Sequence, residues 1–82
     1  MSPDVVTMYS TPWCGYCHRL RAQMDRAGID YRVVDIEADP TAAELVMSVN
    51  DGMQMVPTLL FPDGSALTNP SLEQVKAQLA AA

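Results

Sequence analysis

The chain has few cysteines, few basic residues and no long apolar run, and each scarcity excludes a class of protein. It carries only two cysteines, whereas a secreted disulfide scaffold of this length usually carries roughly four to eight. Five bases stand against ten acids, and the formal charge of −5 argues against a nucleic-acid binder. No run approaches the ~18 apolar residues of a membrane span, and no basic-then-apolar segment resembles a signal peptide. We therefore expect a cytoplasmic protein that binds neither nucleic acid nor membranes.

The length and composition predict one small globular domain spanning residues 1–82. Hydrophobic residues make up 49% of the chain and charged residues 18%, without low-complexity tracts. The few basic residues are unevenly placed, because four of the five follow closely after the two cysteines. These are Arg19, Arg21, Arg26 and Arg32. They give this end of the domain a local positive bias, and solvated side chains on a helix face are the favoured interpretation.

The first half of the chain predicts a strand, a helix and a second parallel strand. Residues 5–9 form a nearly continuous apolar run, which is typical of a strand buried on both faces. A helix is expected from near Cys14 to a C-cap at Gly28, with one apolar stripe. The stripe consists of Cys17, Leu20, Met24 and Ala27. Residues 31–36 read as the second strand, so the unit is βαβ with a right-handed crossover.

The second half predicts a helix, a hairpin and a last helix. Thr41 and Glu44 have the capping-box spacing at the start of the helix. Its buried stripe is expected to comprise Ala42, Leu45, Val46 and Val49. Residues 56–61 and 65–67 form an antiparallel hairpin around the turn at 62–64. A final helix begins at residues 69–71, with Leu72, Val75 and Leu79 facing inward. The predicted order is βαβαββα.

The two cysteines lie three residues apart at the start of the first helix. Cys14 falls in the first turn, where unpaired N–H groups and the helix dipole stabilise an anion such as a thiolate. Such placement can lower a cysteine pKa from about 8.5 into the range of roughly 3.5 to 7.5. Cys17 lies one turn further in, on the core-facing stripe. We therefore predict that Cys14 is the nucleophile and Cys17 the resolving thiol.

The same residues allow other interpretations, which the pattern alone leaves open. Cys14, Cys17 and His18 together spell C-x-x-C-H, the motif for covalent attachment of a c-type haem. We favour His18 as an exposed bystander, because it points away from the sheet if Cys17 points inward. A structural zinc site needs four ligands and finds too few here, so no metal ligand is predicted. An iron–sulfur cluster shared between two chains is a further alternative. Trp13 either packs under the loop or stands exposed beside Cys14.

Four features occur together in this chain: the first strand, the WCGYC motif, the later Val56-Pro57-Thr58 and the hairpin. In this combination the chain resembles the thioredoxin superfamily in its short glutaredoxin form. The resemblance covers essentially the whole chain. It implies a thioredoxin fold, with a four-stranded mixed sheet flanked by three helices. It also implies that Pro57 is preceded by a cis peptide bond and lies opposite the nucleophile, and that the backbone of Val56 hydrogen-bonds the substrate.

The segment Leu67-Thr68-Asn69-Pro70-Ser71 separates this chain from glutaredoxins that use glutathione, which usually carry an acid there. With WCGYC and VPT, the segment is most similar to mycoredoxins, the actinobacterial counterparts of glutaredoxins. This resemblance implies a monomeric oxidoreductase that reduces mixed disulfides between mycothiol and proteins or small molecules. No cofactor is bound, and mycothiol is the co-substrate. The candidate substrate-binding residues are Trp13, Tyr16, Val56, Pro57, Thr68 and Asn69. A thioredoxin-like or glutathione-dependent disulfide reductase is the alternative.

Overall fold

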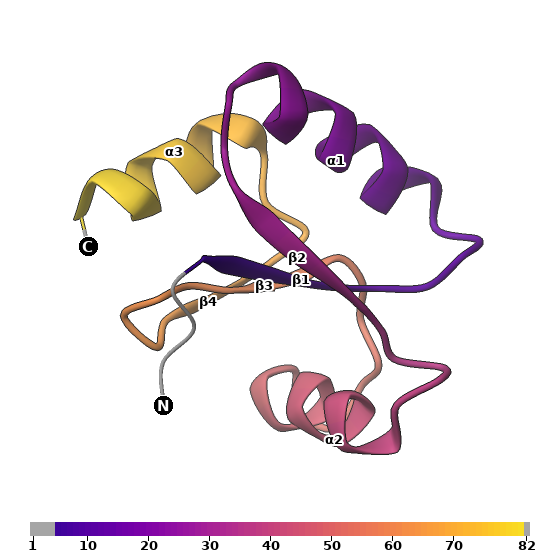
Figure 1. The fold of residues 1–82 in the computed structure, drawn as a ribbon. Coiled ribbons are helices and arrows are strands. Elements are labelled where there is room, and N and C mark those ends of the chain that lie inside the picture. Colours follow the sequence, from indigo (N-terminus) through magenta and orange to yellow (C-terminus); the bar gives the residue numbers. More distant parts are fainter. Residues whose placement is uncertain (1–4, 82) are drawn as a thin grey trace.

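The computed structural model describes residues 5–81, which form a four-stranded mixed sheet with helices on both faces (Figure 1). The strands are β1 (Val6–Ser10), β2 (Tyr31–Asp35), β3 (Thr58–Leu60) and β4 (Ala66–Thr68). The helices are α1 (Gly15–Arg26), α2 (Pro40–Val49) and α3 (Leu72–Ala81). The chain runs β1-α1-β2-α2-β3-β4-α3, which confirms the predicted order.

The strand order β2-β1-β3-β4 brings several connecting segments to one edge of the sheet. β1 and β2 are parallel, as predicted, whereas β3 is antiparallel to both β1 and β4. β1, β2 and β4 therefore run in one direction. The segments that follow these three strands, and the segment that precedes β3, all meet where β1 ends. We call this the carboxyl edge, and it carries the cysteine pair.

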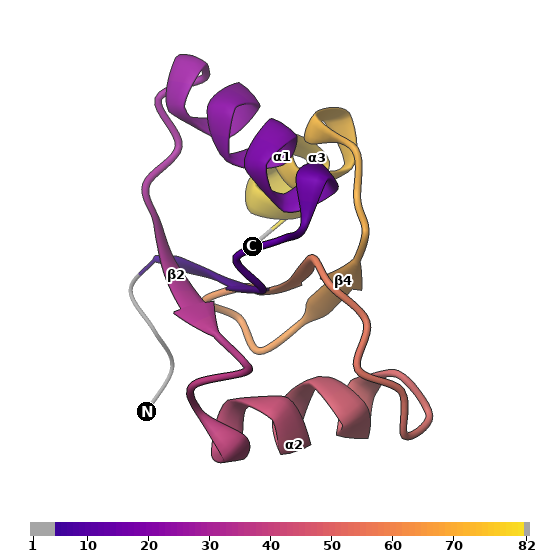
Figure 2. The same cartoon turned by 90° about the vertical axis from the view of Figure 1, so that its right-hand side faces the viewer.

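Helices cover both faces of the sheet, which explains why all five residues of β1 are buried (Figures 1 and 2). α1 and α3 lie on one face and α2 on the other. Because side chains alternate along a strand, Met8 points into the first layer and Tyr9 into the second. The larger cluster, under α1 and α3, comprises Val6, Met8, Cys14, Cys17, Leu20, Met24, Leu59, Phe61 and Val75. The smaller one, over α2, comprises Tyr9, Ile36, Ala42, Ala43 and Val46.

The start of α2 corrects the predicted capping box. Asp39 is the N-cap, and its carboxylate accepts hydrogen bonds from the backbone N–H groups of Thr41 and Ala42 at 3.1 and 3.2 Å. Pro40 follows at the first helical position, where its missing N–H costs nothing. The predicted capping box, with Thr41 as the N-cap and Glu44 as its partner, therefore lay two residues too far along the chain. Aspartate before proline is the stronger N-cap.

The buried stripes are narrower than the sequence suggests. On α2, Ala42 and Val46 are buried as predicted, but Leu45 and Val49 are exposed, and Ala43 takes their place. The face of α2 that packs with Tyr9 and Ile36 is therefore made by Ala42, Ala43 and Val46, and the larger side chains on its flank remain in solvent. On α1, Ala27 is also exposed, because the helix ends at Arg26 and Ala27 is its C-cap.

The ends of the hairpin strands also differ from the predicted ranges. β3 is shorter than residues 56–61, and β4 is shifted one residue beyond residues 65–67. The Phe61 N–H donates to the Ser65 carbonyl at 2.8 Å, which closes the turn outside the strands. In α3, Val75 is buried and Leu72 and Leu79 pack against the larger cluster, as predicted. Within residues 5–81, no helix is long and apolar enough to cross a bilayer.

Candidate active site

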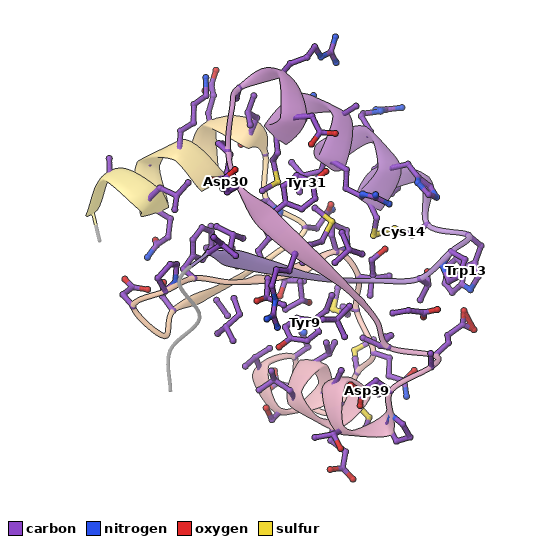
Figure 3. All side chains as sticks on the ribbon, in the orientation of Figure 1. Tyr9, Trp13, Cys14, Asp30, Tyr31 and Asp39 are labelled. Carbon is purple, nitrogen blue, oxygen red and sulfur yellow. A yellow bond between two sulfur atoms is a disulfide. The ribbon has the colours of Figure 1, made fainter. Side chains whose placement is uncertain are left out.

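Cys14 caps the first helix at the carboxyl edge (Figure 3). A turn after β1 joins the Cys14 N–H to the Thr11 carbonyl at 3.2 Å and sets the cysteine in extended backbone conformation. Its Sγ accepts a hydrogen bond from the Cys17 backbone N–H at 3.1 Å. An N-cap normally accepts this bond through oxygen, and here sulfur does so. The same N–H and the positive end of the helix dipole would stabilise a thiolate on Cys14.

Cys17 is the inner member of the pair. It is fully buried in the larger cluster and joined to Cys14 by a disulfide, with the two Cα atoms 5.3 Å apart. Cys14 is also largely buried, but as the N-cap it lies at the end of α1 that is nearest the carboxyl edge. The predicted arrangement of an outer and an inner cysteine one turn apart is confirmed. The pair can take up and release two electrons by opening and closing this disulfide.

Pro57 reaches the same edge from the other side of β1. The Val56–Pro57 peptide bond is cis, as the resemblance implies, and it directly precedes β3. The pairing of Thr58 with Tyr9 sets this segment beside the end of β1. Pro57 is fully buried, and Val56 packs between the two core clusters. The Pro57 carbonyl accepts a 2.7 Å hydrogen bond from the Asn69 N–H, which ties the start of β3 to the end of β4.

A cavity of about 290 Å³ opens between α1 and the start of α3. Three of the predicted residues, Tyr16, Pro57 and Asn69, line it. The full lining is Tyr16, Arg19, Leu20, Gln23, Pro57, Asn69, Pro70, Ser71 and Leu72. Its polar groups are amides, hydroxyls and one guanidinium, and no carboxylate belongs to this set. The Arg19 guanidinium lies 6.0 Å from the centroid of the exposed Tyr16 ring, within cation–π range.

The first turn of α3 is capped by its own side chains. The Ser71 hydroxyl accepts from the Gln74 N–H at 3.2 Å, and the Gln74 amide oxygen accepts from the Ser71 N–H at 2.8 Å. This reciprocal pair is a capping box, and the S-x-x-Q spacing could have predicted it. The capping box satisfies donors that a bound carboxylate would otherwise use.

The Thr68 side chain belongs to a partly buried polar network, which the sequence did not predict. Its hydroxyl donates to the Asn50 side-chain oxygen at 2.6 Å. The Asn50 side-chain amide in turn donates to the Val46 carbonyl at 2.8 Å and to the Thr58 hydroxyl at 3.2 Å. One asparagine thus joins the end of α2 to β3 and β4. Thr68 is not among the residues that line the cavity.

Trp13 stands exposed beside Cys14, with 72% of its surface accessible (Figure 3). Its indole N–H donates to the Glu37 carboxylate at 2.9 Å, across to the loop after β2. His18 is exposed, as predicted, and its Nε2 lies 3.0 Å from the Pro12 carbonyl oxygen. In the part of the chain that the structure describes, no group of three or more His, Cys, Asp or Glu side chains is placed to hold a metal ion.

A second cavity, of about 350 Å³, lies on the α2 face away from the cysteines. Tyr9 and Arg32 from the sheet and Asp39 from the α2 N-cap contribute to its lining. Burial raises the pKa of the Tyr9 hydroxyl, and the positive charge of Arg32 opposes that rise. This cavity is separated from the cysteine pair by the sheet.

Comparison with known proteins agrees with this geometry. The glutaredoxin family model matches residues 6–65. A candidate glutaredoxin of Mycobacterium tuberculosis is 54% identical over 79 residues, which are 96% of this chain and 94% of the relative. Mycoredoxin 1 of Corynebacterium glutamicum is 43% identical over 76 residues, 93% of this chain and 94% of the relative.

Solved structures share the fold at lower identity. The glutaredoxin of Archaeoglobus fulgidus superposes with a TM-score of 0.75 at 26% identity, covering 96% of this chain and 87% of that protein. The glutaredoxin-like NrdH-redoxin from Escherichia coli gives a TM-score of 0.75 at 21% identity, covering 88% and 91% of the two chains. The thioredoxin fold predicted from the sequence is confirmed.

Proposed function

The chain belongs to the glutaredoxin family, whose members are thiol oxidoreductases, and from that premise we propose that it reduces mixed disulfides between mycothiol and proteins or small molecules. Cys14 is the proposed nucleophile. Mycothiol serves as co-substrate, and the protein needs no bound cofactor. The 43% identity with Mycoredoxin 1 over nearly the full chain supports the choice of thiol.

The cavity lining is the observation that carries this proposal. Glutathione has a free ammonium group and two carboxylates, and its ammonium needs an anionic partner when it is bound. No lining residue carries a carboxylate, and the first turn of α3 is capped by Ser71 and Gln74. Mycothiol is an N-acetylated cysteine joined by an amide to a glucosamine–inositol unit. Its many hydroxyls suit the amide, hydroxyl and guanidinium groups of the cavity.

The first chemical step is a thiol–disulfide exchange at Cys14. The Cys14 thiolate attacks the mycothiol sulfur of the mixed disulfide, and a new bond forms between these two sulfurs. The bond from the mycothiol sulfur to the client sulfur breaks, and the electron pair leaves on the client sulfur, which takes a proton from solvent. The client is released reduced, and Cys14 carries the mycothiol.

Two routes then regenerate Cys14. In the first, a second mycothiol thiolate attacks the mycothiol sulfur of the adduct, which yields mycothiol disulfide and the free Cys14 thiolate. In the second, the Cys17 thiolate attacks the Cys14 sulfur, expels mycothiol and forms the internal disulfide. Two further thiol equivalents then reduce that disulfide. The short Cys14–Cys17 separation makes the second route geometrically accessible.

We assign the small thiol to the cavity side of Cys14. Tyr16 and Asn69 are proposed to contact the sugar groups, since both line the cavity. The Val56 backbone is proposed to hydrogen-bond the cysteinyl amide beside Pro57. Thr68 is proposed to act through Asn50, by holding the strand end that carries Asn69.

The test is turnover of two matched small substrates, the mixed disulfides of 2-mercaptoethanol with mycothiol and with glutathione. Each is supplied with its own thiol and an NADPH-dependent reductase for that thiol's disulfide, and NADPH oxidation is followed. We expect turnover with the mycothiol pair. Cys17→Ser retains it by the monothiol route, and Cys14→Ser abolishes it.

The two serine variants control each other, since both remove one sulfur from the same helix turn. Turnover with glutathione alone, or only with a thioredoxin reductase, would contradict the choice of mycothiol. Activity that survives in Cys14→Ser and is lost in Cys17→Ser would contradict the assignment of the nucleophile.

A further inference from the structure

The strand order places two different surfaces on opposite sides of Cys14. Cys14 follows β1, which lies between β2 and β3 in the sheet. The cavity belongs to the β3 and β4 side, because Pro57 precedes β3 and Asn69 follows β4. Trp13 turns the other way, toward the loop that follows β2, where it meets Glu37. Trp13 does not line the cavity, so a molecule bound there leaves the Trp13 side open.

Trp13 is exposed to a binding partner, and a hydrogen bond holds its side chain in one orientation. The residue is 72% exposed, although burying a tryptophan is strongly favourable. Its one polar group, the indole N–H, is fixed by the Glu37 carboxylate at 2.9 Å. A large aromatic side chain with its polar end already paired can bind a partner at little further cost in side-chain entropy.

Glu37 is itself anchored by the loop that carries it. The Asp35 carboxylate accepts the Glu37 N–H at 2.9 Å, and the neighbouring Ile36 N–H donates to the Ser10 carbonyl at 3.0 Å, which extends the pairing of β2 with β1. Asp39 then caps α2. The backbone at Glu37 is therefore held on both sides, and the carboxylate is presented to Trp13 from a fixed point.

We propose that Glu37 is a positioning residue that holds the Trp13 indole as the binding surface for the protein half of the mixed disulfide. This inference rests on the proposed function, in which the cavity takes the mycothiol half. A mixed disulfide has two halves, and the one that leaves during attack by Cys14 is the client polypeptide. With the cavity occupied, the exposed Trp13 ring lies on the side left open to that polypeptide. In a small substrate the leaving half is not a polypeptide, so such a substrate does not use Trp13.

The test compares a cysteinyl peptide and 2-mercaptoethanol, each as its mixed disulfide with mycothiol. We expect Glu37→Ala to raise the KM for the peptide substrate by about fivefold, as loss of one positioning hydrogen bond implies. The peptide kcat and both constants for the small substrate stay within about twofold. Glu37→Gln behaves as wild type, because its amide oxygen can still accept the indole N–H.

Two further measurements separate positioning from a general structural effect. Trp13 is the single tryptophan of the chain, so its fluorescence anisotropy reports the ring directly. Anisotropy falls in Glu37→Ala and is retained in Glu37→Gln. Trp13→Phe raises the peptide KM, and adding Glu37→Ala to it causes no further rise. Asp30→Ala is the matched charge control, because Asp30 precedes β2 at the opposite end of the sheet (Figure 3).

The proposal is overturned if Glu37→Ala changes the peptide and small substrates equally, or changes neither. It is also overturned if Glu37→Gln fails as Glu37→Ala does, since the carboxylate charge and not the hydrogen bond would then matter. Absence of turnover of the small mycothiol substrate by wild type contradicts the proposed function instead. The same peptide comparison is then made with the mixed disulfide of whichever thiol the protein does use.

Discussion

Replacing Asn50 by alanine should destabilise the protein by about 2 kcal/mol. The Asn50 side chain makes three hydrogen bonds, to the Val46 carbonyl and to the Thr58 and Thr68 hydroxyls, at 2.8, 3.2 and 2.6 Å. Each bond is worth about 1 kcal/mol net, and together they would give about 3 kcal/mol. Asn50 is only half-buried, so water can replace part of the lost bonding, and we lower the value accordingly.

The loss is measured by urea unfolding followed by far-UV circular dichroism. Tryptophan fluorescence is a poor probe here, because Trp13 is already exposed in the folded protein. A loss of about 2 kcal/mol should lower Tm by roughly 8–16 °C in a domain of this size. Gln54→Ala is the matched control, because this exposed amide makes only a 3.9 Å contact with the Met47 sulfur. It should change stability by less than about 0.5 kcal/mol.

The Thr68→Val variant tests the network from its other end. The change is nearly isosteric, so the expected cost of about 1 kcal/mol reflects the lost hydrogen bond to Asn50. The double variant with Asn50→Ala should cost about 1 kcal/mol less than the sum of the two single losses. Strict additivity, or an Asn50→Ala loss below about 0.5 kcal/mol, would refute the proposed coupling of α2 to the β3–β4 hairpin.

Three further predictions concern the turn, the last helix and the cavity. Hydrogen bonds from the Ser65 hydroxyl and N–H lower the pKa of Asp63, so Asp63→Asn should be less stable than wild type at neutral pH. That difference is complete above the ordinary carboxyl pKa and disappears as the pH falls through the lowered value, which urea titrations from neutral to acidic pH will check. Ser71→Ala should lose about 1 kcal/mol in the same assay, because it removes the hydroxyl that caps Gln74, and an unchanged stability would exclude the cap. Asn69→Asp adds a carboxylate to the cavity at a position (φ 48°) that aspartate tolerates, so kcat/KM for the glutathione mixed disulfide should rise up to about fivefold relative to the mycothiol one. An unchanged ratio would mean that the cavity does not hold the small thiol.

The largest structural errors of the sequence-based prediction lie where local pattern and packing disagree. Leu45 and Val49 fit a helical apolar stripe, yet they are exposed, because Ala42, Ala43 and Val46 form the face that packs with Tyr9 and Ile36. Thr41 fits a capping box, yet Asp39 is the cap. Apolar spacing shows which residues can share a helix face, and it does not show which part of that face the neighbouring sheet covers.

The Trp13–Glu37 bond illustrates what sequence could have suggested. The two residues are 24 apart, but each follows one of two strands that were predicted to be parallel. The carboxyl ends of such strands meet at one edge, so a polar contact there was a reasonable expectation. The sequence could not predict that Trp13 bonds Glu37 and not Asp35 or Asp39. The Asp35 and Asp39 carboxylates already accept backbone N–H groups of their own loop, from Glu37 and Thr41.

By itself, the sequence determined the order of elements, the parallel β1–β2 pair and the placement of an outer Cys14 and an inner Cys17 at a helix start. Those features depend on residue spacing and local propensity, which a single chain displays directly. Only the tertiary structure decided which side chains come together at the carboxyl edge. The cavity draws on α1, Pro57 and residues 69–72, and the surface opposite draws on Trp13 and Glu37. These segments are distant in sequence and meet only because the sheet order brings their strand ends to one edge, so no local pattern records their contact.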